Sequence, residues 1–205
     1  VREILRYYKV KTGLEIHYDG DLPARSGLGS SSAFTVGLIN SISSNLKMRK
    51  SKKQIASEAI YIEQKMIKEI VGSQDQVATS YGGLNRIMFT KNNFKVKKVN
   101  VSKLKLDLFE KNLLLIFTGV TRQAPKVAHS YVKKIDLIDK KLNLMNDCVN
   151  SFVKILTNGN LDDLGYLLDY AWNIKKSFSK EVSNEFLDKV YNIAKNNGAL
   201  GGKLL

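Results

Sequence analysis

The stretch Pro23-Ala24-Arg25-Ser26-Gly27-Leu28-Gly29-Ser30-Ser31-Ser32-Ala33 is the most informative part of this sequence. Its two glycines, Gly27 and Gly29, allow the backbone to approach a ligand closely and to adopt conformations closed to other residues. The serines cap the start of a helix predicted from about Gly29 to Leu46. Amides at such a start point outward beside the positive end of the helix dipole, which favours a bound phosphate. A plain Gly-Ser helix cap is the alternative interpretation.

The rest of the N-terminal half is predicted to mix helices and strands. Helices are expected at residues 1–11 and 51–70, and Ser73-Gln74-Asp75-Gln76 resembles a capping box that opens a short helix ended by Gly82-Gly83. Alternating or continuous apolar residues predict strands at residues 14–18, 84–89, 94–101 and 113–118. The last of these is almost wholly apolar and is therefore expected to be a central strand.

The C-terminal half is predicted to be helical. Apolar residues from Val127 to Leu156 recur at steps of three and four, which predicts one long amphipathic helix. A second helix is expected to bury the stripe from Leu161 to Phe178, and a third to span about Asn184 to Asn196. We interpret these stripes as core. With a boundary between Thr90 and Asp107, two domains are expected, at residues 1–100 and 101–205.

Composition narrows the classes of function. The chain has 205 residues, and 33 Lys+Arg against 19 Asp+Glu give a formal net charge of +14. The lysines are spread over many segments, so we interpret the charge as a Lys-rich surface and expect no nucleic-acid partner. No run approaches the roughly 20 apolar residues of a membrane helix, so no membrane partner is expected. The single cysteine favours a reducing cytoplasm.

Two carboxylates stand out by their positions. Glu63 lies on the predicted apolar face of the 51–70 helix, where an acid is costly unless it is paired or bound to a cation. The alternative is a glutamate at the edge of that face, reaching solvent or a lysine. Asp75 follows Gly72 at the start of a short helix. It is either a capping residue or a carboxylate that accepts a proton from a substrate hydroxyl.

The order of these features resembles the GHMP superfamily of galactokinase, homoserine kinase, mevalonate kinase and phosphomevalonate kinase. The resemblance rests on Pro-x-x-x-Gly-Leu-Gly-Ser-Ser, a Glu on the next helix, and Gly-x-x-Asp before Gly-Gly. It extends through Ser30–Leu38, Ile62-Glu63-Gln64, Gly72–Gln76, Tyr81-Gly82-Gly83 and Phe117–Arg122. In these segments the sequence looks like the branch that phosphorylates D-glycero-D-manno-heptose 7-phosphate.

The resemblance implies a role for each matching residue, with ATP and Mg²⁺ as cofactors. The residues that would bind the ATP phosphates are Pro23, Gly27, Leu28, Gly29, Ser30, Ser31 and Ser32. Ser31 and Glu63 would hold Mg²⁺, and Asp75 would orient and deprotonate the attacking hydroxyl. Gln74, Gly119 and Arg122 would contact the substrate, Arg122 by clamping its phosphate. A surface arginine at a loop is the alternative for Arg122.

The implied fold is α+β and has two lobes. The first lobe would be like ribosomal S5 domain 2, and the second would be ferredoxin-like with long helices. The expected function is phosphorylation of heptose 7-phosphate at the anomeric hydroxyl, for nucleotide-heptose and surface polysaccharide synthesis. Another sugar 1-kinase, acting on fucose or galactose, and a non-catalytic ligand-binding relative are the alternatives. The oligomeric state is not predicted.

The resemblance also has two departures at the ends of the chain. The family begins with a segment that contacts substrate and nucleotide, and nothing here corresponds to it. Gly201-Gly202-Lys203-Leu204-Leu205 looks like the opening of a third, Gly-rich family motif. We therefore expect the chain to be truncated at both ends, with weak or no kinase activity in these 205 residues alone.

Overall fold

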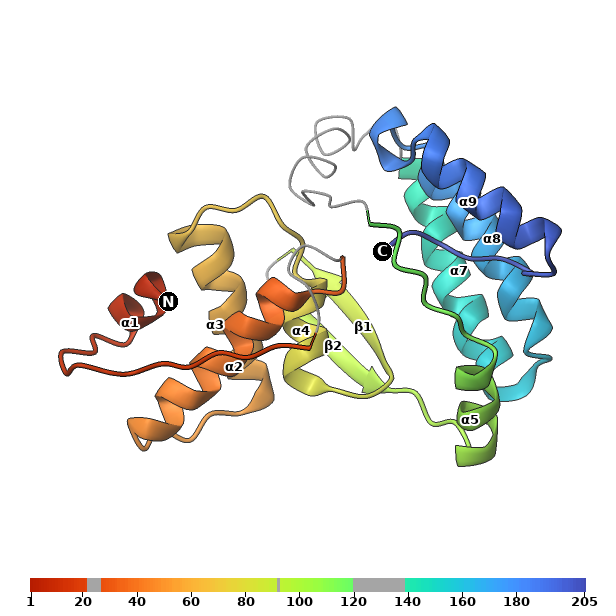
Figure 1. The fold of residues 1–205 in the computed structure, drawn as a ribbon. Coiled ribbons are helices and arrows are strands. Elements are labelled where there is room, and N and C mark those ends of the chain that lie inside the picture. Colours follow the sequence, from red (N-terminus) through yellow and green to blue (C-terminus); the bar gives the residue numbers. More distant parts are fainter. Residues whose placement is uncertain (22–26, 92, 120–138) are drawn as a thin grey trace. The chain divides into compact units, whose positions relative to one another are not determined.

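The computed structural model describes residues 1–21, 27–91, 93–119 and 139–205 (Figure 1). These residues divide into two compact units. The first unit contains the described residues of 1–98, and the second contains residues 99–119 and 139–205. Each unit has buried apolar residues of its own.

The first unit contains the helices predicted on either side of the Gly- and Ser-rich stretch. They are α1 (Arg2–Tyr7), α2 (Ser30–Asn45), α3 (Lys52–Tyr61), the π-helix η1 (Ile62–Met66) and α4 (Gln74–Tyr81). The prediction of one helix over 51–70 was wrong at its C-terminal end. The chain leaves the helix after η1, because Lys68 takes a left-handed conformation with φ of 64°.

Two of the predicted strands form an antiparallel hairpin. Strand β1 (Asn85–Thr90) pairs with β2 (Asn93–Lys98), with Asn85 opposite Lys98 and Thr90 opposite Asn93. Phe94 on β2 is buried with Ala56 of α3 and Val77 of α4. The hairpin therefore packs on α4, which carries Asp75, and on α3, which leads directly into the π-helix that carries Glu63.

The core of the first unit joins α2 to its neighbours. Its buried side chains are Ile4, Val36, Leu38, Ile39, Ile42, Ile55, Ala59 and Ile62. Most lie at helical spacing on α2 and α3, so each helix buries one apolar stripe against the other. This packing fixes the start of α2 relative to η1 and α4.

A partly buried polar cluster ties the end of α1 to α3. Glu58 on α3 accepts a hydrogen bond from the Tyr8 hydroxyl and pairs with Lys50. Lys50 also lies over the Tyr8 ring, with its Nζ 5.3 Å from the ring centroid. Burial, followed by the bond to Glu58, raises the pKa of Tyr8, so the phenol stays protonated and remains a donor.

The described part of the second unit is helical. Its elements are α5 (Lys103–Lys111), α7 (Asp139–Asn158), α8 (Asp162–Lys176), the 3₁₀-helix η3 (Lys180–Val182) and α9 (Glu185–Asn196). Helices α7, α8 and α9 lie side by side (Figure 1). They confirm the three predicted helices, except that the predicted start of the first, at 127–138, lies outside the described residues. No helix within the described ranges has both the length and the apolar character needed to cross a membrane.

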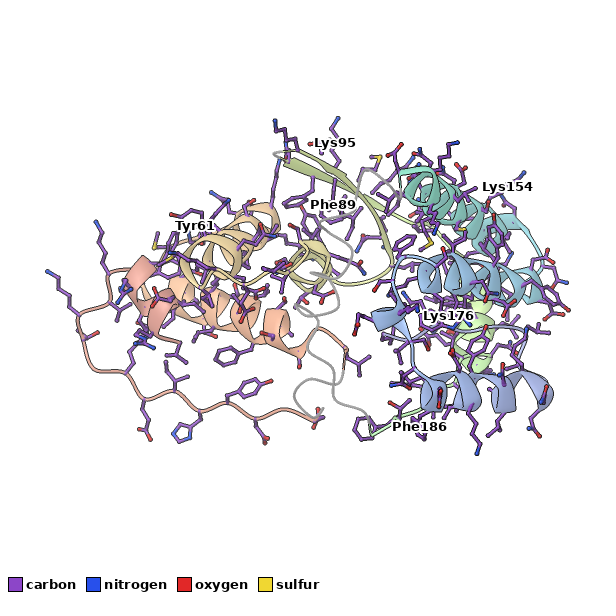
Figure 2. The ribbon with its side chains drawn as sticks, turned by 90° about the horizontal axis from the view of Figure 1, so that it is seen from above. Tyr61, Phe89, Lys95, Lys154, Lys176 and Phe186 are labelled. Carbon is purple, nitrogen blue, oxygen red and sulfur yellow. The ribbon has the colours of Figure 1, made fainter. Side chains whose placement is uncertain are left out.

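One lysine of the second unit packs on two aromatic rings. Lys176 on α8, labelled in Figure 2, lies over the rings of Trp172 and Tyr191, with its Nζ 5.9 and 5.7 Å from the centroids. This contact joins α8 to α9, and Lys176 also pairs with Asp188 at 3.6 Å. Part of the large positive charge is therefore used in packing, as expected for a Lys-rich surface.

The segment after α9 lies directly on α8. A Cβ placed on Gly201 would lie only 1.9 Å from the Gly165 carbonyl oxygen. Two polar contacts hold the same region: Tyr191 donates to Asp169 at 2.5 Å, and Lys195 donates to the Leu200 carbonyl at 2.7 Å. The glycine at position 201 is therefore required by the close approach of two backbones.

Two predicted strands are wrong. Residues 14–18 and 113–118 belong to no strand, and the five side chains from Leu113 to Phe117 are 51–83% exposed. Among the described residues, only β1 and β2 pair as strands. Apolar alternation predicts which face of a strand is buried, but a strand also requires a hydrogen-bonded neighbour, and the pattern does not provide one.

Candidate active site

The start of α2 has the features of an anion site. Gly29, the residue before the helix, takes a left-handed conformation with φ of 72° and ψ of 19°, and Gly27 has φ of 82°. Gly29 has no side chain that could cap the helix. Because the first amides of a helix have no intrahelical acceptor, those at the start of α2 are donors for an external anion. The observed start of α2 therefore agrees with the start predicted from the sequence.

The same glycine lies against Asp75. A Cβ placed on Gly29 would be 3.3 Å from the Asp75 Cγ and 3.4 Å from its Oδ2. Asp75 is exposed in the first turn of α4, whose start depends on the loop after η1. The fold therefore brings a carboxylate next to the Gly29 turn at the start of α2, although the two are far apart in the sequence.

Replacing Gly29 with alanine tests this contact. The left-handed conformation costs a residue with a Cβ about 1–2 kcal/mol, and the new methyl group would press on the Asp75 carboxylate. If that carboxylate takes part in a reaction, a displacement of its position should lower kcat by about 10²-fold. Steady-state kinetics and urea unfolding measure the two effects.

Gly37 provides a matched control for that variant. It lies on α2 as well, and a Cβ there meets no atom within 4 Å. Gly37→Ala should keep kcat and stabilise the helix by about 0.5–1 kcal/mol. Equal kcat values for the Gly29→Ala and Gly37→Ala proteins would contradict a functional contact between Gly29 and Asp75.

A buried polar cluster lies between α2, η1 and α4. Ser32, Glu63 and Gln76 are 6%, 2% and 1% exposed. The Ser32 hydroxyl donates to Glu63 Oε2 at 3.1 Å, and the Gln76 amide donates to the same oxygen. The other oxygen, Oε1, is buried without a hydrogen-bond partner among the described residues. Such an oxygen is costly unless a cation or water satisfies it, so the cluster fits a small metal ion.

The π-helix explains how Glu63 enters this cluster. The Ile67 amide bonds to the Ile62 carbonyl at 2.8 Å, five residues back, and the Glu69 amide bonds to the Glu63 carbonyl at 3.0 Å. This widened turn carries Glu63 directly after α3. Single π turns within helices often occur at functional sites. A straight α-helix was predicted here, and nothing in the periodicity indicated the change.

Gln64 fixes the approach to Asp75. Its amide donates to the Val71 carbonyl at 3.0 Å and to the Ser73 hydroxyl at 3.2 Å. The predicted capping box at Ser73 is wrong, because the Ser73 side chain makes no capping hydrogen bond to α4. Its hydroxyl accepts from Gln64 instead. The loop before Asp75 is thus held by η1, the element that also carries Glu63.

The other predicted site residues lie in several parts of the chain. Ser30, Ser31 and Ser32 form the first turn of α2, and it is Ser32 that bonds Glu63, while Ser31 is exposed. Gln74 is exposed beside Asp75. Gly119 has φ of 70° and lies in the second unit. Pro23 and Arg122 lie outside the described residues.

Sequence reasoning missed Gln64 and Gln76. The sequence shows only that both glutamines are neighbours of the two singled-out carboxylates: Gln64 follows Glu63, and Gln76 follows Asp75. The one available sign that Gln76 faces the core was its position directly before the apolar Val77. Glutamine at helix starts is common on surfaces, so this sign was too weak to use.

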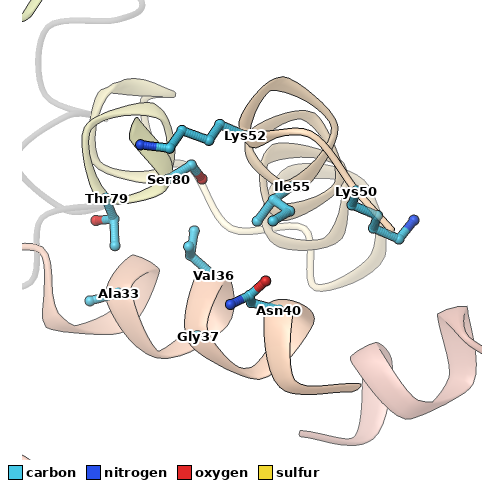
Figure 3. A pocket seen from close by; sticks show the side chains of 9 residues that line it. All are labelled: Ala33, Val36, Gly37, Asn40, Lys50, Lys52, Ile55, Thr79 and Ser80. Carbon is cyan, nitrogen blue, oxygen red and sulfur yellow. The ribbon is translucent and has the colours of Figure 1, made fainter. Parts of the chain in front are cut away.

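A separate groove lies between α2, α3 and α4 (Figure 3). It has a volume of about 440 Å³, and its lining residues are Ala33, Val36, Gly37, Asn40, Lys50, Lys52, Ile55, Thr79 and Ser80. Its two lysines are engaged elsewhere: Lys50 pairs with Glu58, and Lys52 donates to the Tyr81 carbonyl at 2.6 Å. None of the predicted site residues lines this groove.

Comparison with known proteins identifies the family. Residues 1–83 match the family model of the GHMP kinases N terminal domain. The D-glycero-alpha-D-manno-heptose 7-phosphate kinase of Campylobacter jejuni is 32% identical over 98% of this chain and 60% of its own length. Residues 1–83 therefore match the N-terminal domain of the GHMP kinases, and the resemblance identified in the sequence is confirmed. The chain spans about 60% of the length of that curated relative.

Solved structures agree with this assignment. A crystal structure described as a D-glycero-D-manno-heptose 1-phosphate kinase from B. thetaiotaomicron is 25% identical, with a TM-score of 0.63. The match covers 98% of this chain and 57% of the chain in that crystal structure. The crystal structure of L. major mevalonate kinase has a TM-score of 0.69 at 19% identity. The match covers 99% of this chain and 62% of that chain, and such a low identity shows the fold alone. The α+β GHMP kinase fold is confirmed.

Proposed function

We propose that the chain belongs to an ATP-dependent kinase that phosphorylates a sugar phosphate. The proposed substrate is D-glycero-D-manno-heptose 7-phosphate, phosphorylated at its anomeric hydroxyl for nucleotide-heptose and surface polysaccharide synthesis. The 32% identity to the Campylobacter jejuni heptose 7-phosphate kinase supports this choice of substrate. The proposed location is the cytoplasm.

The observation that supports the proposal is that three features lie close together: the start of α2, Asp75 and Glu63. The free amides of the α2 start would bind the ATP phosphates through Gly27, Leu28, Gly29 and the following serines. Asp75 lies against Gly29, and Glu63 lies beside Ser32. Phosphoryl transfer depends on positioning and on neutralising charge, and this arrangement provides groups for both.

Glu63 and Ser31 would hold the metal ion. The unpaired Oε1 of Glu63 is the observation that supports this role, because an ionised carboxylate in such a site needs a cation. Mg²⁺, when bound, neutralises the charge of the β- and γ-phosphates. The cluster offers oxygen donors, which Mg²⁺ prefers.

Asp75 would act on the acceptor. Its carboxylate is exposed and lies next to the turn that binds the phosphates, so it can reach a sugar hydroxyl placed there. We assign it the orientation and deprotonation of that hydroxyl. Gln74, Gly119 and Arg122 are proposed to contact the substrate, with Arg122 suited to a phosphate by its paired N–H donors.

We also propose that the two units correspond to the two lobes of the enzyme, at residues 1–100 and 101–205. The compact units divide at residues 98 and 99, and the match to the N-terminal domain family lies within the first unit.

A substrate panel tests the proposed function. The full-length protein is assayed for ADP release with ATP, Mg²⁺ and either heptose 7-phosphate, fucose, galactose or other free hexoses. Turnover is expected with heptose 7-phosphate, and ³¹P NMR of the product should show a phosphate on the anomeric carbon. Activity on free hexoses alone would overturn the proposed substrate. ATP binding without any transfer would favour a non-catalytic relative.

A further inference from the structure

Gln76 is a buried polar residue to which the proposed reaction assigns no role. It is 1% exposed in the first turn of α4, and its amide donates to Glu63 Oε2 on η1. Its own carbonyl oxygen, Oε1, is buried without a hydrogen-bond partner among the described residues. A buried amide with an unpaired oxygen is costly, so packing alone does not explain why this position holds glutamine.

The orientation of this amide follows from the charge of its partner. An ionised carboxylate only accepts hydrogen bonds, so the NH₂ group of Gln76 must face Glu63. Ser32 donates to the same oxygen at 3.1 Å. Two donors on Oε2 hold the carboxylate in one rotamer and leave Oε1 with its lone pairs free. The pair of donors therefore selects which oxygen remains available for a cation.

Gln76 also links the two carboxylates of the site. It is adjacent to Asp75 in the first turn of α4, and its hydrogen bond reaches the element that carries Glu63. The contact between Gly29 and Asp75 joins the same turn to the start of α2. A change in the Gln76–Glu63 bond would thus move the metal ligand relative to the proposed base.

We propose that Gln76 is a positioning residue that holds Glu63 ready for the metal ion and keeps it in register with Asp75. This inference rests on the proposed function, because it assigns Glu63 to the metal. Groups that orient a metal ligand typically contribute 10–100-fold to metal affinity. Gln76 acts through Glu63, and its loss should therefore appear first in metal binding.

The test replaces Gln76 with methionine in the full-length protein. Methionine has a similar length but cannot donate to Glu63. Electron paramagnetic resonance measures the dissociation constant of Mn²⁺ in the presence of a non-hydrolysable ATP analogue, with no turnover needed. We expect this constant to rise by about 10–100-fold. High Mg²⁺ should also restore much of the kcat lost at low Mg²⁺, which general destabilisation would not allow.

Ser43→Ala serves as the matched control. Ser43 lies on α2 and, like Gln76, is buried, with 2% exposure. Its hydroxyl donates to the Ile39 carbonyl at 2.7 Å. This variant loses a buried hydrogen bond away from Glu63, so it should lower stability without changing the Mn²⁺ constant. Should Gln76→Met fail to fold, Gln76→Asn provides the measurement, since its shorter amide does not reach Glu63.

The outcomes separate this inference from the proposed function. A folded Gln76 variant whose Mn²⁺ constant stays within about twofold of wild type would overturn the positioning role alone. Wild-type protein that binds no metal–nucleotide complex would overturn the proposed function, and the inference with it. Normal metal binding with phosphorylation of a different sugar in place of heptose 7-phosphate would overturn only the proposed substrate, and the effect of Gln76 on Mn²⁺ would still support the inference.

Discussion

Replacing Asp75 with asparagine is expected to lower kcat by about 10²–10⁴-fold, the usual contribution of a general base. Asparagine keeps the shape of the side chain and its contact with Gly29, but it cannot accept a proton. The dissociation constant for ATP should change little, because the proposed phosphate-binding groups lie at the start of α2 and not on Asp75. Steady-state kinetics and fluorescence titration with a nucleotide analogue measure the two quantities.

Asp163 provides the control for this variant. It is likewise an exposed aspartate in the first turn of a helix, α8 of the second unit. Asp163→Asn removes the same charge from the same helical position, so any general effect on the helix dipole is matched. We expect its kcat to stay within about twofold of wild type. A similar kcat in the Asp75→Asn protein would end the assignment of Asp75 as the base.

Replacing Glu63 with glutamine is expected to abolish most metal-dependent activity while leaving the protein folded. A metal ion that neutralises phosphate charge supplies several kcal/mol, so its loss should lower kcat/KM by about 10²–10³-fold. Glu63 is 2% exposed, and removing an uncompensated buried charge removes a desolvation cost. The free energy of unfolding should therefore stay the same or increase. Mg²⁺ titration and urea unfolding measure these opposite effects.

Glu58→Gln should show the reverse pattern. Glu58, on α3, is likewise a poorly exposed glutamate, but it pairs with Lys50 and accepts a hydrogen bond from Tyr8. Its replacement leaves Lys50 without a counter-charge and should lower the free energy of unfolding by about 1–3 kcal/mol, with metal dependence retained. If Glu63→Gln proved equally destabilising and fully active, Glu63 would be a structural acid and the metal site would lie elsewhere.

The longer helices were predictable because their apolar periodicity is regular. The start of α2 followed from two glycines and a run of serines. The sequence left two alternatives for Glu63, and the structure shows the buried one. These features depend on residues close in the sequence, which is where pattern reasoning is strong. The site roles given to these residues by the resemblance stay predictions.

The errors occurred where distant residues decide the structure. Residues 113–118 have a strong strand pattern but no paired neighbour among the described residues. Helix α5 was not predicted, because its leucines at 104, 106 and 108 alternate as in a strand. The amide of Lys105 bonds to the Ser102 hydroxyl at 3.3 Å, and this cap starts the helix. Gln76 was missed because its partner lies on another element.

The π-helix has a consequence for changes in chain length. A regular α-helix advances about 100° per residue, so a one-residue deletion in Ile62–Met66 would close the widened turn and rotate the following side chains by about that angle. The chain after the turn, which leads to Asp75 and Gln76, would then lose its alignment with Glu63. Engineers who shuffle segments between related enzymes should therefore treat the number of residues in this turn as fixed, and place crossovers or insertions after Ile67.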